Sequence, residues 1–164
     1  MSRRAQIALS TAEVADLLAA ERTLVCATIG RDGWPHLMPL WYVLRERSGG
    51  EGSGRDRCEV WSWTYAKSQK VRNLERDPRC TLQVETGEAY AELRGVMIKA
   101  ECELVRDSDA VAALGAELLE RYGGGALTDA AREAMHRQAT KRVALRFVPR
   151  RTASWDHRKL GGTY

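Results

Sequence analysis

The sequence predicts a mainly β (α+β) fold, a small antiparallel β-barrel of six strands with flanking helices. Six apolar or alternating segments have the length of strands, and tight turns separate the early ones. These strands do not alternate regularly with helices, as the parallel sheet of a doubly wound fold would require. Closure into a barrel would also protect the edges that short strands otherwise expose.

The amino-terminal segments predict a helix and a β-hairpin. The tetrapeptide Ser10-Thr11-Ala12-Glu13 is a capping box ahead of apolar residues at helical spacing, so a helix is expected over residues 11–21. Strands are expected over 23–29 and 35–44, because the segment between them, Gly30-Arg31-Asp32-Gly33, has the glycines that a tight turn favours.

The remaining segments complete the barrel. Residues 45–57 contain four glycines and many charges, which predicts a flexible loop. Gly95 lies within a long strand-like segment and indicates a bulge or bend there. Asp107 or Ser108, and then Thr128, are expected to cap two late helices. The other expected strands are 59–64, 79–85, 90–105 and 142–148, the last continued by an extended piece through Trp155 and a C-terminal tail, 156–164.

Length and composition predict one domain over residues 1–164. A chain of 164 residues buries roughly 70% of the surface that it exposes when unfolded, which suffices for a single core. The sequence has no apolar run of about 18 residues or more, and its amino terminus lacks the apolar segment of a signal peptide. We therefore expect a cytoplasmic protein with no membrane partner.

The charge pattern favours a small anionic ligand over nucleic acid. The net charge is +4 and the pI is near 9.0, but arginines alternate with acidic residues, as in Arg45-Glu46-Arg47 and Glu75-Arg76-Asp77. Such mixed charge is typical of a solvated surface. No nucleic-acid-binding motif accompanies it, so we expect no nucleic-acid partner.

The cysteines predict neither a disulfide framework nor a metal site. Cys26, Cys58, Cys80 and Cys102 are more than twenty residues apart and have no nearby histidine to complete a zinc site. Each lies among β-branched or apolar neighbours. We expect buried, reduced thiols in strands, with a disulfide or a metal role as the alternatives.

A phosphate site is predicted where an apolar strand runs directly into a short basic helix. Ser68 can donate its hydroxyl, and Lys67 and Lys70 bring positive charge to one turn. The first N–H groups of a helix have no intrahelical partner and point at such a ligand. Lysine is scarce in this chain, with five among 26 basic residues, and two of the five lie at this corner. The alternative is that these are ordinary solvated charges of a helix.

The order and pattern of these segments resemble the split β-barrel flavin and deazaflavin family, which includes pyridoxamine 5'-phosphate oxidases and F420-dependent oxidoreductases. The resemblance covers roughly residues 13–155. It rests on Ala27-Thr28-Ile29-Gly30-Arg31-Asp32-Gly33-Trp34-Pro35-His36, on Pro39-Leu40-Trp41-Tyr42-Val43 and on the segment from Lys67 to Arg79.

The deazaflavin-using branch is the most similar one. The Lys-Ser-x-Lys-x-x-Asn-Leu pattern, with Pro-Leu-Trp-Tyr-Val and the tail Trp155-Asp156-His157-Arg158-Lys159, resembles that branch. The chain lacks the extra C-terminal length with which pyridoxamine 5'-phosphate oxidases build their substrate site. The resemblance therefore implies coenzyme F420 as the cofactor, with FMN as the alternative.

The resemblance also implies which residues contact the cofactor. Lys67, Ser68, Lys70 and Asn73 would contact its phosphate, and Arg79 or Arg72 would attract the acidic tail of F420. Residues that would line the ring are Pro39, Leu40, Trp41, Trp61, Ser62, Trp63 and Thr64. Since Trp61 and Trp63 point to the same face of one strand, a place in the core or in a dimer interface is the alternative for both.

The candidates for the substrate side are fewer. They are His36, Tyr90, Trp155 and His157. His157 lies near the C-terminus, where the cleft of a partner subunit could receive it. A lone histidine is also often structural, and no side chain is predicted to be catalytically indispensable, because the cofactor supplies the chemistry.

The sequence thus predicts a homodimeric split β-barrel enzyme that passes a hydride from reduced F420 to a C=C or C=N of a small organic substrate. A shallow groove on a small barrel favours enclosure of the cofactor between two subunits. The alternatives are an FMN-dependent oxidoreductase on the same barrel, or a non-catalytic cofactor carrier or ligand-binding protein. No Rossmann, P-loop or hydrolase nucleophile motif is present.

Overall fold

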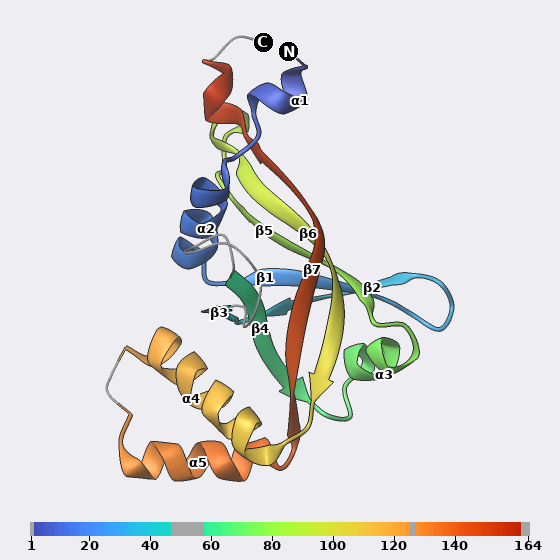
Figure 1. The fold of residues 1–164 in the computed structure, drawn as a ribbon, viewed down its shortest axis with the longest axis vertical. Helices are drawn as coiled ribbons and strands as arrows, with labels where there is room; N and C mark the ends of the chain where they lie inside the picture. Colours follow the sequence, from blue (N-terminus) through green and yellow to red (C-terminus); the bar gives the residue numbers. More distant parts are fainter. Residues whose placement is uncertain (1, 47–57, 125–126, 162–164) are drawn as a thin grey trace.

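One antiparallel sheet organises the molecule (Figure 1). The computed structural model describes residues 2–46, 58–124 and 127–161. Within them, seven strands follow the order β2-β1-β5-β6-β7-β4-β3. The strands are β1 (Leu24–Ile29), β2 (Pro35–Leu40), β3 (Val43–Glu46), β4 (Cys58–Tyr65), β5 (Arg79–Thr86), β6 (Arg94–Val105) and β7 (Arg142–Asp156).

The strand order implies that the sheet curls into a barrel. The strands β2 and β3 stand at opposite ends of the order, yet only Trp41 and Tyr42 join them along the chain. The three Cα–Cα steps from Leu40 to Val43 span at most about 11 Å, so the two edges of the sheet must come close together. The predicted mainly β, antiparallel fold is thus confirmed.

The predicted number of strands is wrong, because the segment expected as one strand over 35–44 is two. The break lies at Tyr42, whose backbone N–H donates to the hydroxyl of Tyr122 at 3.0 Å rather than to a neighbouring strand. The side chain of Tyr42 is fully buried, and its own hydroxyl lies 2.7 Å from the carbonyl oxygen of Leu18. A tertiary anchor therefore interrupts what sequence alone presents as a continuous strand.

Five α-helices flank the sheet in the described part of the chain (Figure 1). They are α1 (Arg3–Gln6), α2 (Thr11–Ala20), α3 (Gln69–Arg76), α4 (Ser108–Gly123) and α5 (Asp129–Ala139). The capping box at Ser10 and the caps at Asp107 and Thr128 are confirmed. None of these described helices is long and apolar enough to cross a membrane.

The main core fills the barrel, and a second one lies under α4. The first includes Leu24, Leu82 and Phe147, and the second joins Val111 and Leu114 of α4 to the outside of the sheet. Burial of such side chains contributes about 1.5–3 kcal/mol each relative to exposure.

The four cysteines form no disulfide, as predicted, and three of the four are buried. Cys26, Cys80 and Cys102 lie in the barrel core, and Cys58 is half-buried at the start of β4. A hydrogen bond to Cys26 and burial raise the pKa of the Cys80 thiol, and burial raises that of Cys102. Thiols held protonated in this way are unreactive.

The long strand β6 differs from expectation in two places. Residues Tyr90–Glu92 form a 3₁₀ helix, so β6 begins only at Arg94. The irregularity in its pairing lies between Lys99 and Ala100, not at Gly95. Gly95 instead accommodates the ring of Trp155, which a Cβ atom would overlap.

Two predicted segments, the flexible loop 45–57 and the C-terminal tail 156–164, are only partly described. Arg45 and Glu46 belong to β3, and the rest of the predicted loop 45–57 lies outside the described residues. The predicted tail 156–164 begins in an ordered structure, since Asp156 ends β7 and His157–Leu160 form a 3₁₀ helix, η3.

Candidate functional site

Helix α3 bridges two strands that are not neighbours in the sheet. The amide of Asn73, which is 0% exposed, donates to Oγ1 of Thr28 in β1 at 3.0 Å. Nζ of Lys70, which is 7% exposed, donates to Oγ1 of Thr64 in β4 at 3.1 Å. Gln69 in turn donates to the carbonyl oxygen of the Asn73 side chain at 2.9 Å. The amino-terminal end of α3 is therefore fixed at the seam between the β1–β2 hairpin and β4.

Two polar side chains at this corner lack a partner: a buried lysine has no carboxylate, and a buried hydroxyl has no hydrogen bond. Lys70 forms no ion pair with a carboxylate in the described part of the chain, and burial lowers its pKa. Ser68 occupies the N-cap position of α3, but its side chain caps nothing, and its buried Oγ has no hydrogen-bond partner among the described residues. We call Ser68, Lys70 and the first N–H groups of α3 the anion cradle.

The anion cradle fits a phosphate. Phosphate oxygens would accept from the Ser68 hydroxyl and from the helix N–H groups that precede Val71, and their charge would compensate Lys70. Lys67 is exposed beside the cradle. Arg79 is bound instead to Asp77, with 2.7 Å between Nη2 and Oδ2, and this pairing lowers the pKa of Asp77 to about 2.

A hollow beside the cradle collects most of the residues predicted to line a cofactor ring. Its volume is about 440 Å³. Its lining residues are Thr23, Pro39, Leu40, Trp41, Trp63, Thr64 and Arg142. Thr64 is the residue that Lys70 contacts, so the hollow and the cradle meet at this threonine. We call this the aromatic hollow.

Two of the predicted ring-lining residues lie outside the aromatic hollow. Ser62 is buried and donates to the carbonyl oxygen of Trp41 at 2.7 Å. It therefore fixes the backbone of Trp41 and does not line the hollow itself. Trp61 lies beneath the guanidinium groups of Arg45 and Arg146, 4.6 and 5.8 Å from its ring centre. The structure does not bring Trp61 to the hollow.

The predicted substrate residues fall into two separate groups. His36 lies opposite Thr28 in the hairpin and lines a second hollow of about 450 Å³ next to Gln69 and Asn73. Its Nδ1 is buried without a hydrogen-bond partner in the described structure.

Tyr90, Trp155 and His157 lie at the far end of the long strands. The rings of Tyr90 and His157 are 4.4 Å apart, and Trp155 packs on Gly95. The thirteen residues of β7 from Val143, which pairs with Thr64, to Trp155 span roughly 40 Å at the rise of a β-strand. Within one chain these residues cannot reach the aromatic hollow.

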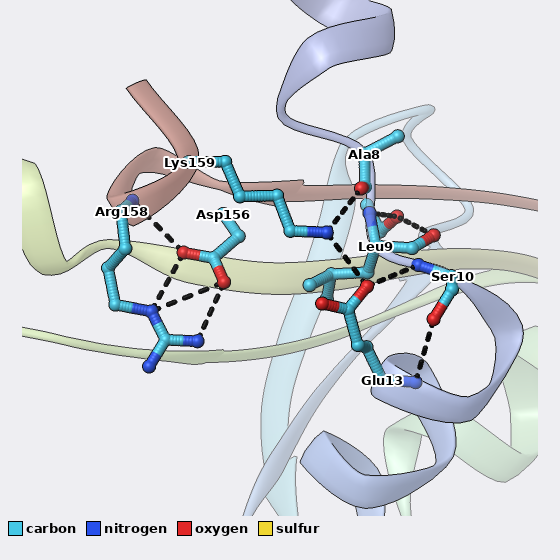
Figure 2. Close-up of polar contacts among 8 residues, drawn as sticks. Ala8, Leu9, Ser10, Glu13, Asp156, Arg158 and Lys159 are labelled. Carbon is cyan, nitrogen blue, oxygen red and sulfur yellow. Dashed lines mark hydrogen bonds and ion pairs between the residues drawn. The ribbon is translucent and has the colours of Figure 1, made fainter. Parts of the chain in front are cut away.

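Contacts between the two chain termini explain the charged tail (Figure 2). Arg158 forms a two-pronged ion pair with Asp156, at 2.7 and 2.9 Å. Nζ of Lys159 contacts Oε2 of Glu13 at 2.7 Å and the carbonyl oxygen of Ala8 at 2.9 Å. We call this set the terminal clasp, because Lys159 ties η3 to Glu13 of α2 and to Ala8 in the segment before α2.

A larger hollow of about 750 Å³ lies between α2 and the strands β6 and β7. Leu18 and Ile98 form part of its floor, and Arg4 and Arg151 contribute charge. None of the three unpartnered buried polar atoms in the described structure belongs to its lining. The chemistry of the cradle, rather than volume, therefore identifies the candidate site.

Sequence reasoning missed several residues of this site, among them Thr23 in the lining of the hollow, Thr28, Arg142 and Tyr122. Thr28 was detectable, since it is a polar residue at an inward position of β1, in line with Leu24 and Cys26. Arg142 and Tyr122 carry no such signal, because their places depend on how α4, α5 and β7 pack.

The fold is that of an antiparallel β-barrel, and one of its corners has groups that fit a phosphate. A family model described as Pyridoxamine 5'-phosphate oxidase matches residues 10–156. The chain therefore belongs to this family, and the resemblance seen in the sequence is confirmed.

Solved structures agree with this assignment. The conserved hypothetical protein Rv2991 from Mycobacterium tuberculosis is 42% identical, with a TM-score of 0.83 over 100% of this chain and 95% of that one. A structure described as an F420 reductase is 21% identical, with a TM-score of 0.59 over 84% and 94%. The heme storage protein HutZ from Vibrio cholerae is 18% identical, with a TM-score of 0.62 over 88% and 92%. At these identities the last two show the shared fold alone. A search of curated proteins found no match.

Proposed function

We propose that the protein is an F420-dependent oxidoreductase that reduces a C=C or C=N of a small organic molecule. The observation that carries the proposal is the anion cradle: a buried lysine without a carboxylate partner and a buried N-cap hydroxyl without an acceptor, next to an aromatic hollow. Unsatisfied buried polar groups are costly, so their presence is best explained by a ligand that completes them.

In this proposal Ser68, Lys70 and the first turn of α3 hold the cofactor phosphate. Pro39, Leu40 and Trp41 offer apolar surface to the ring face and keep water from it. Trp41 suits this role because its ring stacks on Tyr122 at 4.5 Å and 3°, which fixes its plane. Reduced F420 would supply the hydride, and solvent can deliver the proton, so no dedicated acid is required.

The choice of F420 over FMN rests on the sequence pattern of the deazaflavin branch. The fold shared with an F420 reductase is compatible with it. An FMN-dependent oxidoreductase would use the same cradle, and a non-catalytic carrier would use the same hollow. We also propose a cytoplasmic location, which suits the reduced cysteines.

A homodimer belongs to the proposal, and the β1–β2 hairpin offers a surface for it. Val25, Ile29 and Leu37 are exposed, and the pairing register places all three on the same outer face of the hairpin. A second copy covering this apolar face could also bring Tyr90 and His157 of one subunit to the hollow of the other. Sedimentation should give a dimer for the wild type, and Leu37→Glu should shift it toward monomer.

The test is a titration of the purified protein with F420 and, separately, with FMN, followed by quenching of tryptophan fluorescence. Trp41 and Trp63 line the hollow, so a ring bound there should quench them. The proposal predicts tighter binding of F420, then turnover of reduced F420 with a panel of enones and imines. Preference for FMN would favour the flavoenzyme, and F420 binding without turnover would favour the carrier.

A further inference from the structure

The aromatic hollow contains one charged side chain, Arg142. Its other lining residues are threonines, a proline, a leucine and two tryptophans. A mainly apolar hollow with one fixed charge is typical of a site that orients a small ligand through one polar group. Lys70 contacts the hollow only through Thr64 and belongs to the anion cradle.

The guanidinium of Arg142 is held in place by two aromatic rings. Arg142 is the first residue of β7 and pairs directly with Tyr65 of β4. Its guanidinium carbon lies 4.3 Å from the ring centres of both Tyr65 and Trp63. Stacking of this kind fixes the plane of the guanidinium and reduces the entropy lost when it binds a ligand.

The same guanidinium has unused donors. Its Nε donates to Gln138 over a long 3.4 Å, and no carboxylate of the described chain forms an ion pair with it. Arg146 lies four residues further along β7 on the same face. It instead contacts Glu59 and Glu103, at 2.8 and 3.0 Å. Both terminal nitrogens of Arg142 thus remain available for a planar anion, and a guanidinium matches a carboxylate through two parallel hydrogen bonds.

We propose that Arg142 binds the carboxylate of the substrate, so that the aromatic hollow selects conjugated or aromatic carboxylic acids over their neutral analogues. The inference deepens the proposed function by naming its substrate class and rests on that function for the role of the hollow. Trp63, which lies beside Arg142, would face the conjugated part of the acid, and Arg142 would fix its carboxylate at the hollow's edge, while Trp41 stays against the cofactor ring. Arg142 is accordingly a specificity residue.

The experiment titrates cofactor-free protein with trans-cinnamate and with cinnamamide, which differ only in the charged group, and follows tryptophan fluorescence. The wild type should bind the acid about 10- to 100-fold more tightly, the range given by one charge-assisted pair. Arg142→Gln should abolish this preference while leaving amide binding within about twofold. Arg142→Lys, which keeps the charge but not the planar fork, should retain part of it.

The control is Arg150→Gln, which changes an exposed arginine of β7 that pairs with Glu101 outside the hollow. It should keep the wild-type preference. Equal binding of acid and amide by the wild type, or an unchanged preference in Arg142→Gln, would overturn the proposal. Weaker F420 binding by Arg142→Gln without any acid preference in the wild type would assign the guanidinium to the cofactor's acidic tail and also overturn it. Since the titration needs no cofactor, a failure of F420 to bind is a separate result.

Discussion

The anion cradle and the terminal clasp use similar residues in opposite ways. Both combine lysine, a hydroxyl and the start of a helix, and both come from charged segments of the sequence. In the clasp, Lys159 meets Glu13, Asp156 meets Arg158, and the Ser10 hydroxyl caps α2 (Figure 2). In the cradle, the buried Lys70 has no carboxylate partner and the Ser68 hydroxyl has no acceptor in the described structure. Satisfied charges stabilise a fold, whereas unsatisfied buried ones indicate a binding site.

The largest expected difference concerns Lys70→Met. The change should raise the Kd for F420 by about 10- to 100-fold, because a charge-assisted hydrogen bond contributes about 1.5–3 kcal/mol. It should leave the free energy of unfolding unchanged or raise it, since it removes a buried charge without a partner. Fluorescence titration and urea unfolding measure the two quantities. Lys99→Met, at an exposed position of β6, is the control. Lower stability with unchanged affinity would assign Lys70 to the fold rather than to the site.

Asp156→Asn should give the reverse pattern. Asp156 is 2% exposed and accepts from both the backbone and the guanidinium of Arg158. Loss of its charge should cost about 1–3 kcal/mol of the free energy of unfolding. Affinity for F420 should change far less than in Lys70→Met, because within one chain the clasp lies roughly 40 Å of strand away from Thr64 and none of its side chains belongs to the anion cradle. A loss of affinity at wild-type stability would show that the clasp is not purely structural.

Much of the fold and part of the site could be predicted from sequence. The caps of α2, α4 and α5 and the strands with clear alternation follow from local chemistry, and the cradle follows from a strand that runs directly into a basic helix. The break at Tyr42 and the stacking of Arg142 could not be predicted, since both depend on partners about 80 residues away in sequence, Tyr122 and Trp63. The sequence shows the residues of the terminal clasp only as part of the family pattern. The ion pair between the two termini could not be predicted, because a contact between segments far apart in sequence leaves no periodic signal.

Two glycine-to-alanine substitutions crowd a tryptophan ring in the same way, one beside the aromatic hollow and one at the far end of the long strands. Gly115→Ala places a Cβ 2.5 Å from the ring of Trp63, and Gly95→Ala overlaps the ring of Trp155. Each should cost about 1–3 kcal/mol of stability through overpacking, with Gly115→Ala at the low end because alanine favours the helix. Only Gly115→Ala should alter F420 affinity, by a few-fold, since only Trp63 lines the hollow. Equal effects of both variants on affinity would contradict the separation of the two regions.

The smallest expected effect is on the pH dependence of the free energy of unfolding. The terminal clasp should contribute to it at acid pH and the anion cradle at alkaline pH. The ion pair with Lys159 lowers the pKa of Glu13 to about 2 from 4.5, so its stabilisation is present above pH 4.5 and is lost as pH falls toward 2. Burial lowers the pKa of Lys70 below 10.5, so stability should rise with pH between its folded value and 10.5, where the unfolded chain binds more protons. The free energy of unfolding should be measured with urea at a series of pH values. Glu13→Gln should remove its dependence on pH on the acid side, and Lys70→Met should remove the dependence on the alkaline side.

The most direct test of the account is a crystal structure of the protein with F420 bound. We expect the cofactor phosphate within hydrogen-bond distance of Ser68 Oγ and Lys70 Nζ, with the ring against Trp41. A phosphate bound elsewhere, for example at Arg4 and Arg151 in the larger hollow, would contradict the claim that the unsatisfied groups of α3 form the binding site.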